Sequence, residues 1–242
     1  MSLTSSSVTT NGINGTNGTI FKPVTHVIFD MDGLLLDSEK CYHELDESIV
    51  AKYGKKYPDG LKEMIRGFTD LDCARKIIEV CGLPITPEEY DQEFNSFLYL
   101  LQDCKLMPGA ERLIRHLAKH NIPMGIATSS SHESVQNKIK NHREVFDLIP
   151  HMVMGSSDPE VIKGKPHPDV FLVCAKRFPG NPEPEKCLVF EDAPSGVTAA
   201  NKAGMQVVWV PYGDVKCTED NATYVIKSLL DFVPEKFGLP PF

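Results

Sequence analysis

Residues 24–39 read VTHVIFDMDGLLLDSE, and this stretch joins an apolar run to a group of acidic side chains. The run HVIFD (His26–Asp30) is continuous rather than alternating, which is typical of a strand buried on both faces of a parallel sheet. Asp30 and Asp32 stand at its end. Burying a carboxylate without a partner costs several kcal/mol, so the stretch predicts that a cation joins the two aspartates.

Further apolar runs of the same kind recur along the chain. They are MGIAT (124–128), MVMG (152–155), CLVFE (187–191) and VVWVP (207–211). The segments between them have helical periodicity; in one, Leu113, Ile114 and Leu117 form a single apolar face. Strands alternating with helices predict an α/β fold with a doubly wound parallel sheet, Rossmann-like in its winding.

One interval, residues 38–105, breaks this alternation because it has helical periodicity and no convincing strand. Gly82 is placed to end one helix, and Thr86, Pro87 and Glu89 form a capping box with a proline in the first turn of the next. The apolar face expected for that helix consists of Tyr90, Phe94, Phe97, Leu98 and Leu101. Helices this short are not stable alone, so the interval predicts a small helical bundle, a cap domain.

The predicted domain plan is therefore a core built from residues 23–37 and 106–242, with the cap inserted between them. Residues 1–22 consist mainly of Ser, Thr, Asn and Gly, and predict a disordered tail.

Composition narrows the class of protein. The net charge of −8 argues against nucleic-acid polymers and anionic membranes as partners, and no apolar run reaches the ~18 residues of a membrane span. Seven cysteines without a C-x-x-C pair are typical of reduced thiols, which predicts a cytoplasmic protein. We expect a monomer whose partner is a small molecule.

Ligands of an open parallel sheet bind beyond the carboxyl ends of its strands. Asp30 and Asp32 follow the first strand, and Glu191 and Asp192 follow another. Clustered carboxylates without a His/Cys set suit a hard, oxygen-bound cation, and the octahedral preference of Mg²⁺ fits better than zinc. Mg²⁺ is therefore the cation that the opening stretch predicts.

Two further loops reach the same edge of the predicted sheet. Thr128 ends a strand, and Lys165 lies in the loop KGKPHPD just ahead of a helix. With the cation bound, this edge can accept a phosphate dianion, with Thr128 and backbone N–H groups as donors and Lys165 as a point charge. A carboxylate can then attack phosphorus and form an aspartyl-phosphate.

The segment FDMDGLLLDSE resembles the first motif, D-x-D-G-x-x-x-D, of the haloacid dehalogenase superfamily. ATSSS, GKPHPD and FEDAPSG are similar to its second, third and fourth motifs, in the same order. The resemblance extends over nearly the whole chain after the tail. Within the superfamily, the wider sequence resembles the eukaryotic pseudouridine-5′-phosphatases and the glycerol-phosphate phosphatases.

This resemblance implies a role for each acidic residue. Asp30 would be the nucleophile, and Asp32 the general acid and base. Mg²⁺ would be held by a carboxyl oxygen of Asp30, the backbone carbonyl of Asp32 and the carboxylate of Asp192, with Glu191 acting through water.

The resemblance also implies the phosphate and leaving-group contacts. Thr128, Ser129 and Lys165 would hold the phosphate, with Lys165 also orienting the nucleophile. Arg66, Gly67 and Phe68 of the cap would contact the leaving group. Similar phosphatases carry basic residues directly after this glycine, whereas Phe68 and Thr69 stand here. Arg66 could supply the missing charge, Phe68 could stack on a base, or both could be ordinary residues of a helix turn.

Several functions share these motifs. The leading one is a Mg²⁺-dependent phosphomonoesterase with pseudouridine 5′-phosphate as substrate; glycerol phosphate, or another sugar or polyol phosphate, is the alternative. A phosphomutase would share every core motif. A dehalogenase needs neither Asp32 nor Asp192. A phosphonate hydrolase would need a desolvated cap lysine, whereas we expect Lys62 and the other cap lysines to be exposed.

Overall fold

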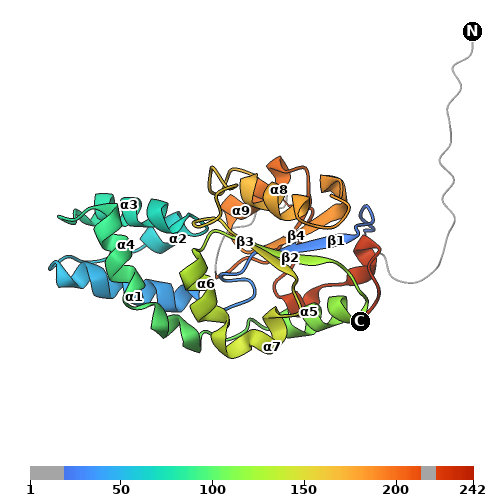
Figure 1. Cartoon of the computed structure of the whole chain (residues 1–242), viewed down its shortest axis with the longest axis horizontal. Helices are drawn as coiled ribbons and strands as arrows, with labels where there is room; N and C mark the ends of the chain where they lie inside the picture. Colours follow the sequence, from blue (N-terminus) through green and yellow to red (C-terminus); the bar gives the residue numbers. More distant parts are fainter. Residues whose placement is uncertain (1–18, 214–221) are drawn as a thin grey trace, which may run out of the picture.

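The computed structural model describes residues 19–213 and 222–242, and most of the predicted tail therefore lies outside the described residues. All six strands are parallel and form one sheet in the order β3-β2-β1-β4-β5-β6 (Figure 1). The strands are β1 (His26–Phe29), β2 (Met124–Thr128), β3 (His151–Met154), β4 (Cys187–Glu191), β5 (Gln206–Trp209) and β6 (Tyr224–Val225). The predicted doubly wound sheet is confirmed, and β6, only two residues long, is an addition that no apolar run indicates.

Alternate residues of β1 face two different helix layers. Val27 and Phe29 pack into the core beneath α5, α6 and α7, whereas Ile28 packs against α8 and α9 on the other face. Figure 1 shows the two helix layers on opposite sides of the sheet. These helices are α5 (Ala110–Lys119), α6 (His132–Ile139), α7 (Arg143–Phe146), α8 (Asp169–Lys176) and α9 (Pro194–Lys202). Burial on both faces explains why the strands are continuous apolar runs.

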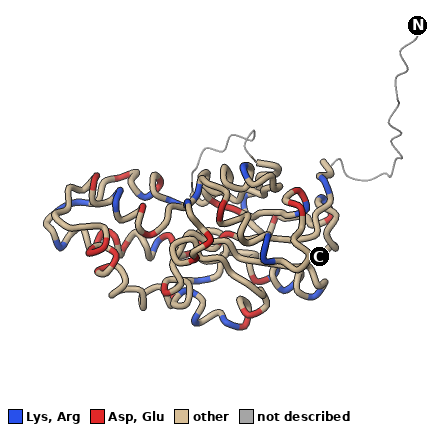
Figure 2. The backbone as a smooth tube through the Cα atoms, turned by 45° about the horizontal axis from the view of Figure 1, so that its top comes forward, with Lys and Arg blue, Asp and Glu red and all other residues tan. Residues whose placement is uncertain are grey.

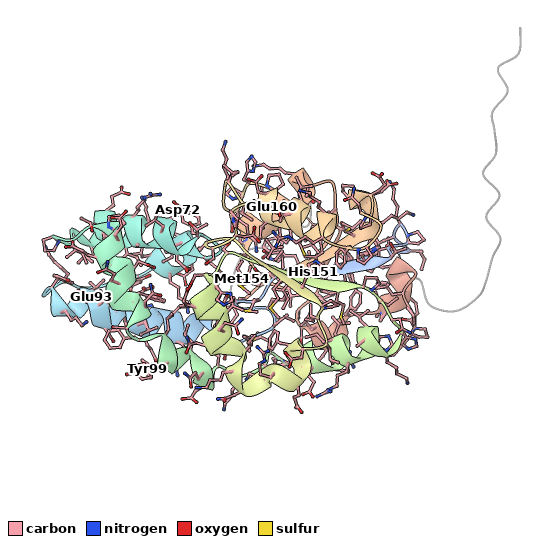
Figure 3. The ribbon with its side chains drawn as sticks, viewed as in Figure 1. Asp72, Glu93, Tyr99, His151, Met154 and Glu160 are labelled. Atoms are coloured by element: carbon pink, nitrogen blue, oxygen red, sulfur yellow. The ribbon has the colours of Figure 1, made fainter. Side chains whose placement is uncertain are left out.

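Short 3-10 helices complete the core. They are η2 (Lys140–His142), η3 (Pro184–Lys186), η5 (Leu229–Asp231) and η6 (Pro234–Phe237). In Figure 3 His151 and Met154 mark β3, which is the strand at one edge of the sheet.

The insertion folds as helices around apolar clusters of its own, one of them centred on Ile49, Ile77 and Tyr90. Its helices are α1 (Glu39–Lys52), α2 (Leu61–Ile65), α3 (Asp70–Cys81), α4 (Pro87–Asn95) and the 3-10 helix η1 (Leu98–Asp103). Gly82 ends α3 in the left-handed region, and Thr86 and Glu89 form the predicted capping box of α4. The chain enters and leaves the insertion side by side, since Asp37 N donates to Lys105 O (2.8 Å). We therefore propose the domain limits near residues 37 and 105.

The last predicted cap helix is shorter than its apolar face indicates. The face from Tyr90 to Leu101 is divided between α4, which ends at Asn95, and η1. The Ser96 hydroxyl donates to Glu93 O (2.6 Å), and such local side-chain bonds compete with the helical backbone pattern. Leu98 and Leu101 are still buried, in a small cluster with Leu45.

Acidic and basic residues are interspersed along both parts of the chain in Figure 2. None of the helices in the described ranges combines the length and apolar character needed to cross a bilayer.

Candidate active site

Asp30 lies at the carboxyl end of β1 and is bound by Lys165, which reaches it from the loop before α8. Lys165 Nζ lies 2.6 Å from Asp30 Oδ1 and 2.6 Å from Glu191 Oε1, and it also donates to Ala127 O (3.3 Å). All three charged side chains are buried. Burial raises the pKa of Asp30 to about 7 despite the opposing charge of Lys165. A single lysine thus fixes the orientation of two carboxylates, leaving Asp30 Oδ2 for other partners.

Asp192, directly after β4, has a carboxylate oxygen with no partner. Its Oδ2 is buried and forms no hydrogen bond with any described residue, and burial together with Glu191 and Asp30 raises its pKa. Asp30, Glu191 and Asp192 offer oxygens that lie within 4.8 Å of one another. A Cβ at Gly33 would lie 2.5 Å from Asp192 Oδ2, so only glycine fits beside these oxygens. This oxygen-only set fits a hard divalent cation.

The single tryptophan of the chain forms a hydrogen bond to the backbone of this site. Trp209 is buried in β5, and its indole N–H donates to the backbone carbonyl of Asp192 (2.9 Å). This bond holds the loop that presents Glu191 and Asp192. Glu191 is held as well, because its Oε2 accepts from Ala193 N (2.9 Å).

Asp32 is bound by a lysine that sequence reasoning missed. Lys138 Nζ lies 2.6 Å from both carboxylate oxygens of Asp32 and donates to Ser130 Oγ (2.9 Å). Burial alone would raise the pKa of Asp32, but Lys138 and hydrogen bonds from Ser38 and Ser130 hold it below its ordinary value. The side chain of Lys138 is fully buried, with its ammonium over the ring of Tyr42. Asp32 is thus held as an anion beside Asp30.

The position of Lys138 in the sequence does carry a signal. It stands three residues after Val135 and directly before Ile139, on the buried face of α6. A lysine on the apolar face of a short helix needs a buried partner. That signal can be recognised only once the helix has been assigned.

The hydroxyls at the end of β2 lie beside Asp30 and Asp32, and they divide between two partners. Thr128 Oγ1 donates to Asp32 Oδ2 (3.3 Å), and Ser130 Oγ donates to the same oxygen (2.8 Å). Ser129 instead donates from its hydroxyl to the carbonyl of Gly67 in the cap (2.8 Å). The Ser129 side chain therefore connects the cap to the core in this structure.

Further bonds hold the cap against the core. Ser195, at the start of α9, donates to Arg66 O (3.1 Å), and Ser131 N donates to Asp70 Oδ2 (3.0 Å). Gly67 has φ +81°, and a Cβ there would lie 2.3 Å from Ser195 Oγ. The glycine is therefore needed both for its backbone angle and for this close approach.

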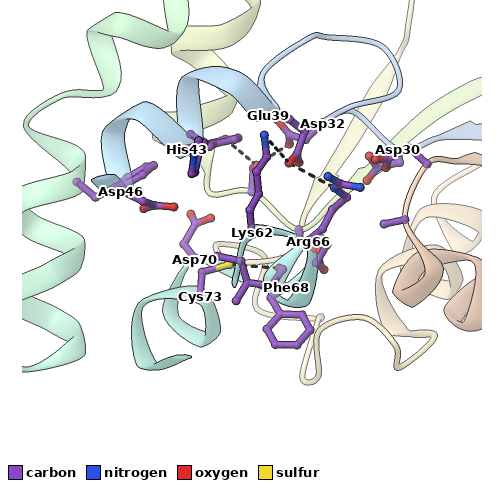
Figure 4. Close-up of a pocket in the computed structure, with 18 of the residues that line it drawn as sticks. Asp30, Asp32, Glu39, His43, Asp46, Lys62, Arg66, Phe68, Asp70 and Cys73 are labelled. Atoms are coloured by element: carbon purple, nitrogen blue, oxygen red, sulfur yellow. Dashed lines mark hydrogen bonds and ion pairs between the residues drawn. The ribbon is translucent and has the colours of Figure 1, made fainter. Parts of the chain in front are cut away.

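The three predicted cap residues differ in where they lie. Arg66 is buried, contacts Glu39 Oε2 (3.4 Å), donates to Tyr212 O (3.1 Å) and stacks over the Tyr212 ring. Phe68 lines the same cavity but also packs on the apolar cluster of the cap, and Figure 4 shows its ring turned away from Asp30. The prediction that the cap lysines are exposed is wrong for Lys62, which lines the cavity with a side chain only 20% exposed beside Glu39.

One cavity connects these groups, with about 840 Å³ of empty space, part of it open to solvent. Asp192 also lines it, and it extends from Asp30 under the cap to Asp46, both labelled in Figure 4. We call Asp30, Asp32, Glu191 and Asp192 the acidic rim.

All the core residues predicted for the site therefore lie near one another. Asp30, Asp32, Glu191, Asp192 and Ser129 line the cavity; Thr128 and Lys165 lie behind its wall, bonded to Asp32 and Asp30 respectively.

Residues 27–210 match the haloacid dehalogenase-like hydrolase family. A relative from Drosophila melanogaster, described as "Probable pseudouridine-5′-phosphatase", is 50% identical over 228 residues, or 92% of this chain and 97% of that protein. A relative from Arabidopsis thaliana, "(DL)-glycerol-3-phosphatase 2", is 48% identical over 90% of this chain and 93% of that protein.

Solved structures share the fold. A hydrolase from Pseudomonas syringae superposes with a TM-score of 0.73 at 26% identity and covers 86% of this chain and 95% of that chain. A β-phosphoglucomutase from Clostridium difficile gives 0.71 at 24% identity, covering 88% and 97%. The chain belongs to the haloacid dehalogenase-like hydrolase family, and it is an enzyme of the phosphatase class.

Proposed function

We propose that the enzyme is a Mg²⁺-dependent phosphomonoesterase that works through an aspartyl-phosphate on Asp30. The observation that carries the proposal is the buried group Asp30–Lys165–Glu191–Asp192 with its unpartnered carboxylate oxygen. Asp30, Asp192 and, through water, Glu191 would hold Mg²⁺, as would the backbone carbonyl of Asp32. When bound, Mg²⁺ supplies Lewis acidity toward the phosphoryl oxygens and neutralises charge on the acidic rim.

The residues of the chain divide the reaction between them. A carboxylate oxygen of Asp30 attacks phosphorus, and the bond to the ester oxygen breaks. The leaving alkoxide takes a proton from Asp32, which has to gain that proton from solvent before this step because Lys138 lowers its pKa. Asp32 then removes a proton from water, whose oxygen attacks phosphorus and releases Asp30 and inorganic phosphate. Lys165 keeps Asp30 oriented throughout. The contact of Lys138 with Asp32 fits the second step, which needs an anionic base.

Phosphate binding is assigned to Thr128, Ser129 and Lys165. Lys165 is a buried cation beside Asp30, and the Thr128 hydroxyl donates a hydrogen bond to Asp32. The Ser129 hydroxyl is used in the bond to Gly67, so we assign its contribution to the backbone N–H.

The leading substrate is pseudouridine 5′-phosphate, supported by the 50% identity to the Drosophila relative. The alternative is glycerol phosphate, supported by the 48% identity to the Arabidopsis glycerol-3-phosphatase. We also propose that the enzyme is a cytoplasmic monomer. The cytoplasmic location is supported by the described cysteines, which are free thiols, including Cys41 and Cys104, whose sulfurs are 3.6 Å apart.

One screen tests the assignment. Phosphate release is measured for nucleoside, sugar and polyol monophosphates after EDTA treatment, and again after adding Mg²⁺ or Ca²⁺. We expect no release in EDTA, recovery with Mg²⁺, and inhibition by Ca²⁺, whose larger and looser coordination shell disturbs the attack geometry. Full activity in EDTA would contradict the assignment of a metal to this site. Isomerisation of a sugar phosphate without net phosphate release would instead identify a phosphomutase.

A further inference from the structure

The cap end of the cavity contains a buried carboxylate with one oxygen to spare. Asp46, on α1, is 7% exposed and accepts a hydrogen bond from Tyr90 on Oδ1 (2.7 Å). Within residues 19–213 and 222–242 it forms no other hydrogen bond and no ion pair. Asp46 lines the cavity. Its Oδ2 is not fully enclosed by protein, so it is open to the cavity and can accept a hydrogen bond from a ligand there.

Two neighbours add acceptors at the same end. Figure 4 shows the carboxylate of Asp70, at the start of α3, facing that of Asp46. Asp70 uses Oδ2 to accept from Ser131 N, which leaves Oδ1. His43 lines the cavity with a buried Nδ1 that has no hydrogen-bond partner, while its Nε2 lies 3.6 Å from Glu47. A proton on Nε2, facing that carboxylate, makes Nδ1 a further acceptor.

The cations of the cavity do not neutralise these acceptors. Lys62 and Arg66 both lie beside Glu39, at 3.9 Å and 3.4 Å, and Arg66 also donates to Tyr212 O. Neither forms an ion pair with Asp46 or Asp70. The cap end therefore presents oxygen and nitrogen acceptors whose negative charge is offset only at a distance, by Lys62 for Asp46 and by Lys138 for Asp70, without an ion pair.

We propose that His43, Asp46 and Asp70 form a cap pocket that binds an uncharged leaving group rich in hydroxyl or N–H donors, and that rejects leaving groups carrying a second anion. The proposal rests on the phosphatase function above, since the leaving group must extend from the acidic rim under the cap. A donor-rich group satisfies the spare acceptors, whereas an anion placed beside two carboxylates is repelled.

A matched pair of phosphates tests the pocket. Glucitol 6-phosphate and 6-phosphogluconate differ only in a terminal CH₂OH or carboxylate. Both are measured as competitive inhibitors of p-nitrophenyl phosphate hydrolysis at pH 8 with Mg²⁺. We expect 6-phosphogluconate to bind at least about 30-fold more weakly, because like charges brought together cost several kcal/mol. The double substitution Asp46→Asn/Asp70→Asn should narrow the ratio to within about threefold.

Asp59→Asn, the same chemical change at an exposed cap position, should keep the wild-type ratio. If the double variant does not fold, Asp46→Asn alone serves, because asparagine can still accept from Tyr90. A wild-type ratio near one, or a ratio unchanged in the variants, overturns the pocket while p-nitrophenyl phosphate hydrolysis still supports the phosphatase. Absence of metal-dependent hydrolysis of p-nitrophenyl phosphate would instead reject the phosphatase function itself.

Discussion

The acidic rim and the cap pocket both bury carboxylates, but they compensate them differently. At the rim Lys165 holds Asp30 and Glu191, and Lys138 holds Asp32, each at 2.6 Å. The fourth rim carboxylate, Asp192, has no lysine partner among the described residues and carries the oxygen assigned to the cation. In the cap pocket, among the described residues, Asp46 accepts from the Tyr90 hydroxyl and Asp70 from the backbone N–H of Ser131, and neither forms an ion pair. Paired carboxylates have fixed positions, which suits chemistry that is the same for every substrate. Carboxylates without an ion pair can accept hydrogen bonds from a ligand, which suits selection of that ligand.

The largest effect should follow a change at the rim. Asp30→Asn keeps the shape of the side chain but removes the attacking oxygen, so turnover should fall more than about 10³-fold on every substrate. Phosphate release at saturating substrate and Mg²⁺ measures this. Asp103→Asn, at an exposed position, is the matched control. Residual activity of more than a few per cent would rule out covalent catalysis by Asp30.

Lys138→Met should lower kcat by about 10²-fold with little change in KM, because Asp32 loses the contact that positions it. Lys140→Met, an exposed neighbour, should have no effect. Removing one partner of a buried ion pair also destabilises the fold, typically by about 3–5 kcal/mol. Adding Asp32→Asn to the variant should restore stability but not activity. Wild-type kcat in a folded Lys138→Met enzyme would remove Lys138 from any positioning role.

A stability measurement tests the burial of Asp46 in the cap pocket. Burial raises the pKa of Asp46 from 3.8 to about 7. The folded state therefore binds this proton more tightly than the unfolded state, and the stability it contributes is present below pH 3.8 and lost as pH rises through 7. Three pKa units set a ceiling of about 4 kcal/mol, and hydration from the cavity reduces this to about 2 kcal/mol.

Asp46→Asn should consequently be more stable than wild type at pH 8 and gain far less at pH 4. Urea unfolding at the two pH values measures the difference, with Asp59→Asn as control. A gain of the same size at both values would show that Asp46 is not a buried acid in solution.

The smallest effect is expected at Phe68, where the interpretation from sequence included stacking on a base. Its ring packs on the apolar cluster of the cap, so Phe68→Ala should change kcat/KM less than about threefold for nucleotide and polyol phosphates alike. A selective loss of about 1–3 kcal/mol on the nucleotide would instead establish base stacking. Either result shows whether leaving-group selection extends beyond the acceptors of the cap pocket.

Most of the fold and the rim could be predicted from the sequence, because buried parallel strands are continuous apolar runs and their carboxyl ends converge. Asp30, Glu191 and Asp192 directly follow such runs. Lys138 could not be found in this way, because it lies within helix α6 and not at the end of a strand. The division of the last cap helix at Ser96 and the two-residue strand β6 depend on local bonds and tertiary pairing, which no periodicity records.

The bond from the Trp209 indole to the Asp192 carbonyl gives the enzyme an internal optical reporter. Indole emission responds to the electric field around the ring, and here the only tryptophan of the chain touches the loop that holds the unpartnered carboxylate. A divalent cation arriving at that loop changes the field without changing the exposure of the ring. Fluorescence of the unlabelled protein should therefore follow cation binding directly, in the absence of any substrate.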